Sequence, residues 1–306
     1  MTVQSIAAYY SLFLVVVGTT MNLLTLIILL RPVFRHRKLK PTIYYMRVIV
    51  VFDILMLYGW NLDHYLSAIQ GFTIQRLSIP VCRLMSFLNY FAPQSSAWLR
   101  VFACIDRYFI VSRPHETWLS SSKNIVIIIT CLLSFIAVLN CQFFILGCSY
   151  NTNGTISVLS PSFKVYPLWD YINLGFYNCL PFIFMVLFNS GVIYYLSHLY
   201  NINVIQRRSV SVTLIITTFL FLVMTVPATI AFAFFSTANS ALLAFLDSLL
   251  YTYHITSFPL YLITFGDFQR EFYKLITCHK NHRQVLPQHF IVQYKKPMNV
   301  KSKDPP

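Results

Sequence analysis

The chain has 306 residues, of which 57% are hydrophobic and only 10% are charged, and its mean hydropathy is +0.63. Soluble domains carry about 25% charged residues, so this composition excludes an ordinary water-soluble domain and indicates a membrane protein. The formal net charge of +14 comes from short basic segments between apolar runs, which favours a role in membrane topology over nucleic-acid binding.

Seven apolar runs follow one another along the chain, each long enough to cross a bilayer as a helix. They span about residues 9–30, 43–66, 81–111, 124–146, 169–199, 209–235 and 242–265. Because sustained two-residue alternation is absent, helices are favoured over the strands of a barrel. We therefore expect an all-α fold, in which residues 1–278 form a seven-transmembrane helix bundle with a short amphipathic eighth helix at about 267–278. A basic tail, 279–306, follows.

Lysine and arginine predict how the chain is oriented in the membrane. Of the 23 Lys and Arg residues, 17 lie in the segments after the first, third and fifth runs and in the tail. Only two, Arg76 and Lys164, lie in the opposite segments. The positive-inside rule then places the N-terminus outside the cell and the tail in the cytosol. The glycosylation sequon at Asn153 falls on the predicted outer side, in agreement with this orientation.

The inner end of the third run reads IDRYFIVSRP, in which Asp106, Arg107 and Tyr108 are followed by a proline. Cys82 lies 25 residues before Arg107. Further motif residues at matching depths are Asn22, Asp53, Pro181, Phe221 and Pro227, and Tyr261 seven residues before Phe268. In this order they resemble the rhodopsin-like (class A) G-protein-coupled receptors over nearly the whole chain.

The chain departs from that pattern at four places, and with these departures it resembles divergent invertebrate relatives of the receptors for FMRFamide and other neuropeptides. The seventh run has SFPLY, with Ser257 in place of an asparagine and the proline displaced. Thr225 stands where the sixth helix usually has tryptophan, Cys131 where the fourth has tryptophan, and Asn189 where the fifth often has tyrosine.

The resemblance implies a plasma-membrane receptor, not an enzyme, that binds an extracellular peptide and activates a heterotrimeric G-protein. Its partners would include membrane lipids but not nucleic acid. Residues implied in coupling and activation are Asp106, Arg107, Tyr108 and Tyr261. The resemblance also implies a disulfide between Cys82 and the second outer loop, for which we expect Cys148. Cys278 ends the amphipathic stretch DFQREFYKLITC, and two alternatives stay open for it: palmitoylation or a bare cytosolic thiol.

A polar core is expected around Asp53, where Asn22, Ser96, Arg100 and Ser257 match or adjoin the family's polar positions. Three alternatives remain open at this stage: a sodium ion near Asp53, a protonated Asp53, or an ion pair with Arg100. Side chains of a helix lean toward its N-terminus, which brings Arg100 toward Asp53. Arg100 could instead face water in the inner cavity. We expect no other cofactor.

The resemblance also restricts the ligand. Opsins need a lysine in the seventh helix for retinal, and residues 242–265 contain none. Amine receptors use an aspartate where this chain has Asn89. The expected ligand pocket consists of Asp63, His64, Asn89, Tyr90, Asp170, Asn173, Phe232, Phe235 and Asp247. Its three acids favour a cationic ligand such as an Arg-containing amidated peptide, unless they only cap helix ends.

Two further expectations concern activity. Residues 201–218 contain no acid that could restrain Arg107, so the restraint would rest on Asp106 and ligand-independent activity should be appreciable. The alternative functions are a chemosensory seven-helix channel or transporter, or a receptor for a small-molecule odorant.

Overall fold

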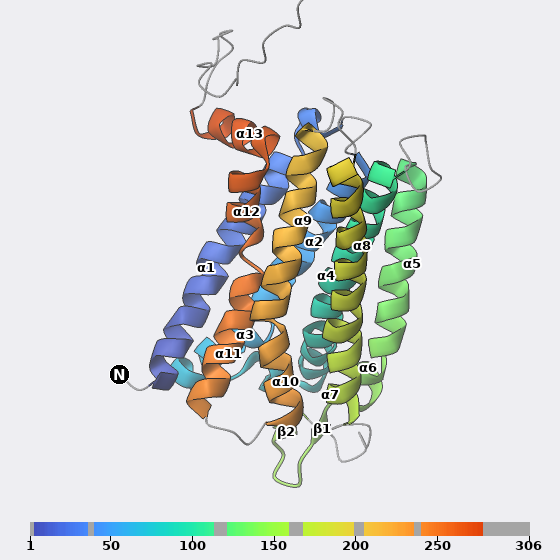
Figure 1. Ribbon diagram of the computed structural model, residues 1–306. Helices are drawn as coiled ribbons and strands as arrows, with labels where there is room; N and C mark the ends of the chain where they lie inside the picture. The colour runs from blue at the N-terminus through green and yellow to red at the C-terminus, as the bar shows by residue number, and fades with distance from the viewer. Residues whose placement is uncertain are drawn as a thin grey trace, which may run out of the picture.

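A computed structural model describes residues 3–35, 40–112, 121–158, 168–198, 205–235 and 240–277. These segments form a bundle of long helices, with a small β-hairpin at one end and α13 lying across the other (Figure 1). The expected palmitoylation site, Cys278, and the predicted tail, 279–306, lie outside the described residues.

Within these segments, the helices form seven successive passes along the bundle, in chain order, as expected from the seven apolar runs. We call each pass, which consists of one or more consecutive helices, a leg. The elements are α1 (Val3–Leu29), η1 (Pro32–Arg35), α2 (Lys40–Tyr58), α3 (Trp60–Tyr65), η2 (Leu66–Gln70), η3 (Ile74–Arg76), α4 (Ile79–Ser112), α5 (Ser122–Asn140), α6 (Gln142–Leu146), β1 (Ser149–Tyr150), β2 (Ile156–Ser157), α7 (Leu168–Asn173), η5 (Leu174–Cys179), α8 (Leu180–His198), α9 (Ile205–Met224), α10 (Val226–Phe234), α11 (Ser240–Tyr253), α12 (Ser257–Thr264) and α13 (Gly266–Ile276). The second, fourth, fifth, sixth and seventh legs are each built from more than one of these elements.

Five helical segments are long and apolar enough to cross a membrane by length and composition alone. They are Gln4–Leu29, Thr42–Gln70, Lys123–Leu146, Leu168–His198 and Val210–Phe234. The other two legs differ for separate reasons. α4 has 34 residues but a polar interior that includes Arg100 and Asp106, and the seventh leg is divided into α11 and α12.

Two breaks in the legs have identifiable causes. α9 ends at Met224 and α10 begins at Val226, beside Pro227, which has no amide hydrogen to continue the helical ladder. Between α11 and α12, the carbonyl of His254 accepts a hydrogen bond from Asn22 Nδ2 at 3.1 Å. A side chain thus satisfies backbone released by the break, as a membrane interior requires.

A cluster of aromatic rings joins α13 to the bundle. Phe268 is fully buried, and its ring contacts Tyr261 at 5.7 Å and Phe258 at 5.9 Å. α13 follows the seventh leg after a turn at Phe265, which confirms an amphipathic helix after the last span, here ending at Ile276.

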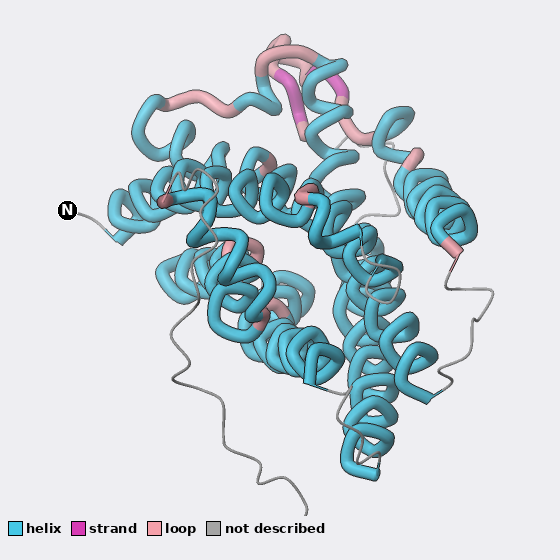
Figure 2. Tube along the Cα trace, turned by 90° about the horizontal axis from the view of Figure 1, so that it is seen from above, coloured by secondary structure: helices cyan, strands magenta, loops and turns pink. Residues whose placement is uncertain are grey.

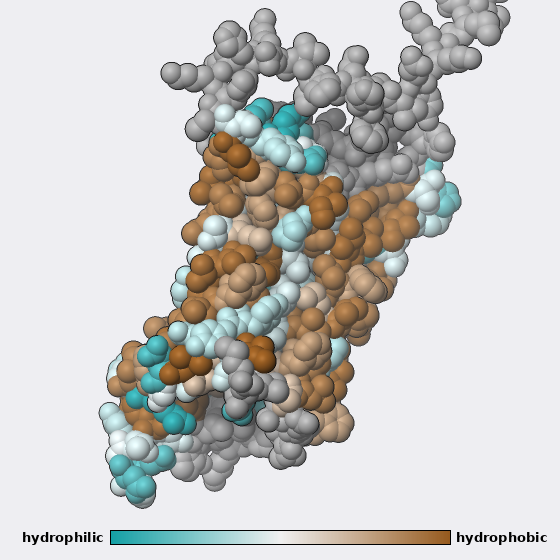
Figure 3. Space-filling view, turned by 90° about the vertical axis from the view of Figure 1, so that its left-hand side faces the viewer, coloured by the Kyte–Doolittle hydropathy of each residue, from teal (hydrophilic) through white to brown (hydrophobic). Residues whose placement is uncertain are grey.

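The surface of the bundle is mainly apolar, as expected of a membrane protein. In Figure 3, hydrophobic residues cover most of the middle of the face and hydrophilic residues gather toward its two ends. α5 is especially exposed along Val126, Phe135 and Val138. Viewed along the bundle, the strands of the β-hairpin lie at its edge (Figure 2).

Candidate functional site

A buried polar cluster lies at the centre of the bundle, around Asp53 of α2. Asp53 Oδ1 accepts hydrogen bonds from Ser96 Oγ at 2.8 Å, Arg100 Nη2 at 3.1 Å and His254 Nδ1 at 2.8 Å. Asp53 Oδ2 accepts a second bond from Arg100 Nη2 at 2.7 Å. The cluster therefore joins α2, α4 and the break between α11 and α12 around one carboxylate.

Arg100 takes the position that the lean of helical side chains predicts. Its Nη1 donates to Ser96, one turn earlier in α4, and its guanidinium lies 4.9 Å from the ring centroid of Tyr253. Arg100 is 3% exposed and Asp53 is fully buried. Of the alternatives considered from the sequence, the structure shows the ion pair, and Arg100 does not face water.

The sequence did not identify His254 as a member of this cluster. The residue of the seventh leg that was expected in the polar core was Ser257, which is buried but is not among the described hydrogen-bond partners of Asp53. The irregular backbone before α12 brings His254 to the carboxylate instead. Its only signal in the sequence was a polar, titratable residue within an apolar run.

Near the C-terminal end of α4, Asp106 and Arg107 are both buried. Asp106 Oδ2 accepts a hydrogen bond from Thr42 Oγ1 of α2 at 2.5 Å. This contact was not expected, and it gives Asp106 a partner on another helix. Arg107 is 0% exposed, so its guanidinium lies within the bundle and does not extend to the surface as it would in the snorkelling alternative.

Tyr108 packs against α8, where its ring lies 5.7 Å from Phe188 and 5.8 Å from Tyr195. The same ring covers Gly191, and a Cβ added there would come within 2.6 Å of the Tyr108 ring. The glycine is therefore required by a close approach between helices.

Replacing Gly191 with alanine should lower the stability of the protein by about 1–3 kcal/mol, because the aromatic ring must move out of a packed position. The measurement is the melting temperature of the detergent-solubilised protein. Gly175→Ala is the matched control, since a Cβ at Gly175 meets no atom within 4 Å. Equal melting temperatures for the two variants would contradict the expected clash.

The three acids of the expected ligand pocket each have a partner in the structure. Asp63 Oδ1 accepts the backbone N–H of Ile74 at 2.8 Å, which agrees with a structural role at the start of η3. Asp247 Oδ2 lies 2.9 Å from His64 Nδ1 and so connects α11 to α3. The side chain of His64 is 48% exposed, and its ring contacts Tyr251.

The third acid, Asp170, belongs to a polar and aromatic group formed by α4, α6 and α7. Tyr90 Oη donates to Asp170 Oδ1 at 3.4 Å, and its ring stacks on Phe143 with centroids 4.6 Å apart. Gln94 Nε2 donates to Asn173 Oδ1 at 2.9 Å. The sequence placed Tyr90, Asp170 and Asn173 together but missed Gln94 and Phe143.

The other expected lining residues separate into two sets. Asn89 Oδ1 accepts the backbone N–H of Trp60 at 3.1 Å, at the junction of α2 and α3. Phe232 and Phe235 are 40% and 59% exposed, so the structure does not bury them with the polar residues. Their place in the expected pocket is therefore the least supported.

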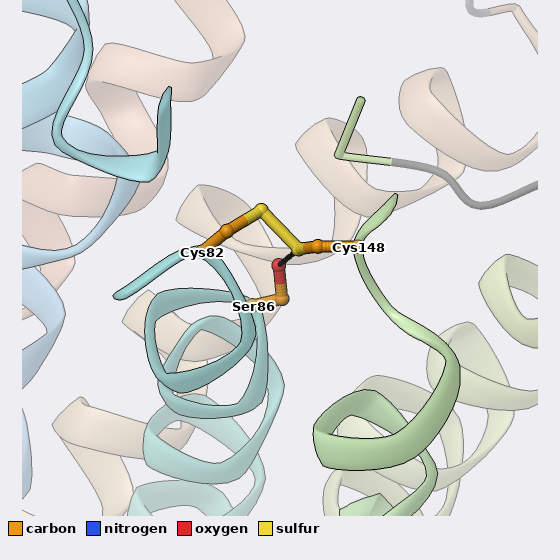
Figure 4. Close-up of a disulfide and its surroundings, with 3 residues drawn as sticks. All are labelled: Cys82, Ser86 and Cys148. Carbon is orange, nitrogen blue, oxygen red and sulfur yellow. Dashed lines mark hydrogen bonds between the residues drawn. A yellow bond between two sulfur atoms is a disulfide. The ribbon is translucent and has the colours of Figure 1, made fainter. Parts of the chain in front are cut away.

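A disulfide joins Cys82 near the N-terminal end of α4 to Cys148 just before β1, as expected (Figure 4). Ser86 Oγ lies 3.9 Å from Cys148 Sγ. The bond attaches the β-hairpin to the end of α4. Asn153 is exposed on the hairpin turn, beside Gly154 with φ of 72°.

These features define a helical membrane protein with a charged, buried core. No family model matches the chain. Over part of its length it is similar to green-sensitive opsin-2 of Danio rerio, with 29% identity over 119 residues, 38% of this chain and 32% of the relative. Rhodopsin of Petromyzon marinus shares 30% identity over 112 residues, 36% of this chain and 30% of the relative.

Rhodopsin of Leucoraja erinaceus shares 26% identity over 124 residues, 40% of this chain and 33% of the relative. The chain thus spans about a third of the length of the curated relatives it matches. This weak similarity supports the rhodopsin-like class of receptors and agrees with the helical architecture.

Proposed function

We propose that the chain is a rhodopsin-like G-protein-coupled receptor, and not an enzyme, with its N-terminus outside the plasma membrane. Ligand binding at the outer end would shift an existing conformational equilibrium and expose a cytosolic cleft near Arg107 to a heterotrimeric G-protein. The observation that carries the proposal is the seven-leg bundle in which α4 holds Arg100 in the core and buried Arg107 near its C-terminal, inner end.

Two features support this proposal. An intramembrane charge is costly and is retained mainly where it has a function. The partial similarity to opsins points to the same class of receptor. The sequence nevertheless has no lysine in residues 242–265, so we do not propose retinal as a covalently attached ligand.

For the ligand, we propose a peptide with a cationic group that binds Asp247. This carboxylate is mostly buried, and its partner His64 is half exposed at the outer end. A ligand guanidinium could replace His64 with a stronger, charge-assisted bond. Asp63 is less suited, because one of its oxygens is already used by the backbone of Ile74.

Arg100 supports a receptor that is insensitive to sodium. Both oxygens of Asp53 accept hydrogen bonds from the guanidinium, so a cation built into the chain already balances this carboxylate. Replacing sodium chloride with a large organic cation salt at equal ionic strength should leave ligand affinity unchanged. A strong dependence on sodium would contradict this part of the proposal.

The test of the function is nucleotide exchange on a G-protein, with the chain expressed in cells and a library of amidated peptides. We expect exchange above the vector control without ligand and a further rise with an Arg-containing peptide. Arg107→Ala should remove both signals, because it removes the proposed coupling residue. Currents or substrate flux without exchange would favour the channel or transporter alternative.

The ligand site has its own expected result. Asp247→Asn should lower the potency of the active peptide at least tenfold, the reduction expected for one buried charge-assisted hydrogen bond of about 1.5–3 kcal/mol. Asp63→Asn is the comparison variant at the same end of the bundle. Potency should be read at matched receptor amounts on the cell surface. Unchanged potency for Asp247→Asn would remove the proposed cationic contact.

A further inference from the structure

The helical legs are connected in two physically different ways. An ion pair between Asp53 and Arg100 connects α2 to α4, and a hydrogen bond from His254 to the same carboxylate connects them to the seventh leg. By contrast, residues 210–224 of α9 contain no charged side chain, so this part of the helix cannot form an ion pair. Neutral side chains must hold it against its neighbours.

Two such contacts join α9 to two different neighbours. Asn189 Nδ2 of α8 donates to Thr218 Oγ1 at 2.7 Å. Toward the seventh leg, Thr213 Oγ1 and Thr264 Oγ1 of α12 are 2.5 Å apart and share a hydrogen bond. We call these four residues the inner clasp.

The inner clasp lies near the proposed coupling region. Asn189 is two residues before Gly191, which contacts Tyr108, the neighbour of Arg107. Thr264 is the last residue of α12, directly before the turn into α13. Opening both contacts would therefore free α9 beside the inner end of α4.

The opposite end of α9 is suited to movement. The helix stops before Thr225 and Pro227, where the backbone ladder is interrupted. At this junction Thr225 Oγ1 donates to Asn178 Oδ1 of η5 at 3.0 Å. A helix with a break at one end and neutral contacts at the other can tilt as a unit.

We propose that the inner clasp is a restraint that holds residues 210–224 of α9 closed in the resting receptor, through neutral hydrogen bonds. Breaking a neutral hydrogen bond costs far less free energy than separating a buried ion pair. The segment of α9 can therefore open while the Asp53–Arg100 ion pair stays intact. The inference rests on the proposed function, because it names the regulation of the same coupling region.

The test combines Asn189→Leu and Thr264→Val, which remove one member of each contact. Ligand-independent nucleotide exchange should rise about fivefold for each hydrogen bond removed, the factor that corresponds to one ordinary hydrogen bond. Thr217→Val is the matched control, because its hydroxyl bonds to the Thr213 carbonyl within α9 itself. Hydrogen–deuterium exchange of residues 210–224 provides a readout without G-protein, and it should become faster in the clasp variants alone.

A crosslink tests the closed position directly. Thr213→Cys with Thr264→Cys, in a background where Cys131, Cys141, Cys179 and Cys278 are serine, should form a disulfide on oxidation with diamide. Ligand-independent nucleotide exchange should then fall to the level of the vector control, and it should return when the disulfide is reduced. Peptide mapping detects the crosslink independently of activity.

Each outcome decides one question. Failure of the crosslink, or amide exchange no faster than in Thr217→Val, would overturn the inner clasp even if the receptor signals. A crosslinked protein that still supports full nucleotide exchange would also overturn it. Silent wild-type and variant proteins, with the crosslink and the faster amide exchange both present, would refute the proposed function and leave the clasp as a restraint on α9.

Discussion

Replacing Arg100 with methionine should destabilise the protein by about 3–5 kcal/mol, the cost of leaving a buried charge without its partner. Asp53 is fully buried, and Arg100 is the only arginine or lysine that contacts it among the described residues. Ser96 and His254 would remain as hydrogen-bond partners of Asp53, but the permanently charged member of its ion pair would be gone. The measurement is the melting temperature in detergent together with the amount of folded protein.

The double variant Asp53→Asn with Arg100→Met should recover much of that stability, since no uncompensated charge then stays buried. Arg270→Met is the matched control on an exposed pair with Asp267, where a surface salt bridge is worth about 0–1 kcal/mol. If Arg100→Met and Arg270→Met have the same melting temperature, the Asp53–Arg100 ion pair does not stabilise the core. If the double variant is no better than Arg100→Met, the cost does not come from the unpaired carboxylate.

Removing the disulfide with Cys82→Ser and Cys148→Ser should cost about 4 kcal/mol. The two cysteines are 66 residues apart, so the bond closes a long loop and reduces the entropy of the unfolded chain considerably. Locally, the β-hairpin would no longer be covalently attached to the end of α4. The melting temperature should fall, and proteolysis of the hairpin should become faster.

Cys131→Ser is the control for this prediction, because Cys131 is free and exposed. Reducing agent should lower the melting temperature of the wild-type protein toward that of the double-serine variant and leave the variant itself unchanged. A wild-type protein that is insensitive to both reduction and substitution would contradict a stabilising disulfide.

The helical legs were predictable because a membrane imposes a simple rule on the backbone. Every buried N–H and C=O needs a partner within the chain, so an apolar run of sufficient length becomes a helix. The breaks within the legs were less predictable. Pro227 indicates from the sequence that the sixth leg is divided. The seventh leg is divided at residues 254–256, which contain no proline, and there the hydrogen bond from Asn22 to the His254 carbonyl accompanies the break.

The candidate site was predictable where a side chain's direction follows from its own helix. The lean of side chains toward the N-terminus of α4 made contact between Arg100 and Asp53 one of the alternatives, and the structure selected it. The role of His254 was not predictable in the same way. It lies 201 residues from Asp53 in the chain, and its rotation depends on the irregular backbone between α11 and α12.

The sequence by itself predicted a helical membrane protein and the order of its legs, because hydropathy acts over short distances along the chain. The Cys82–Cys148 disulfide was expected from the resemblance to a receptor family, and the structure contains it. Only the tertiary structure decided the partners. Asp106 bonds to Thr42, His64 to Asp247, and Thr213 to Thr264. Such pairs depend on the depth and rotation of helices that are distant in sequence, which packing sets and no single run of residues encodes.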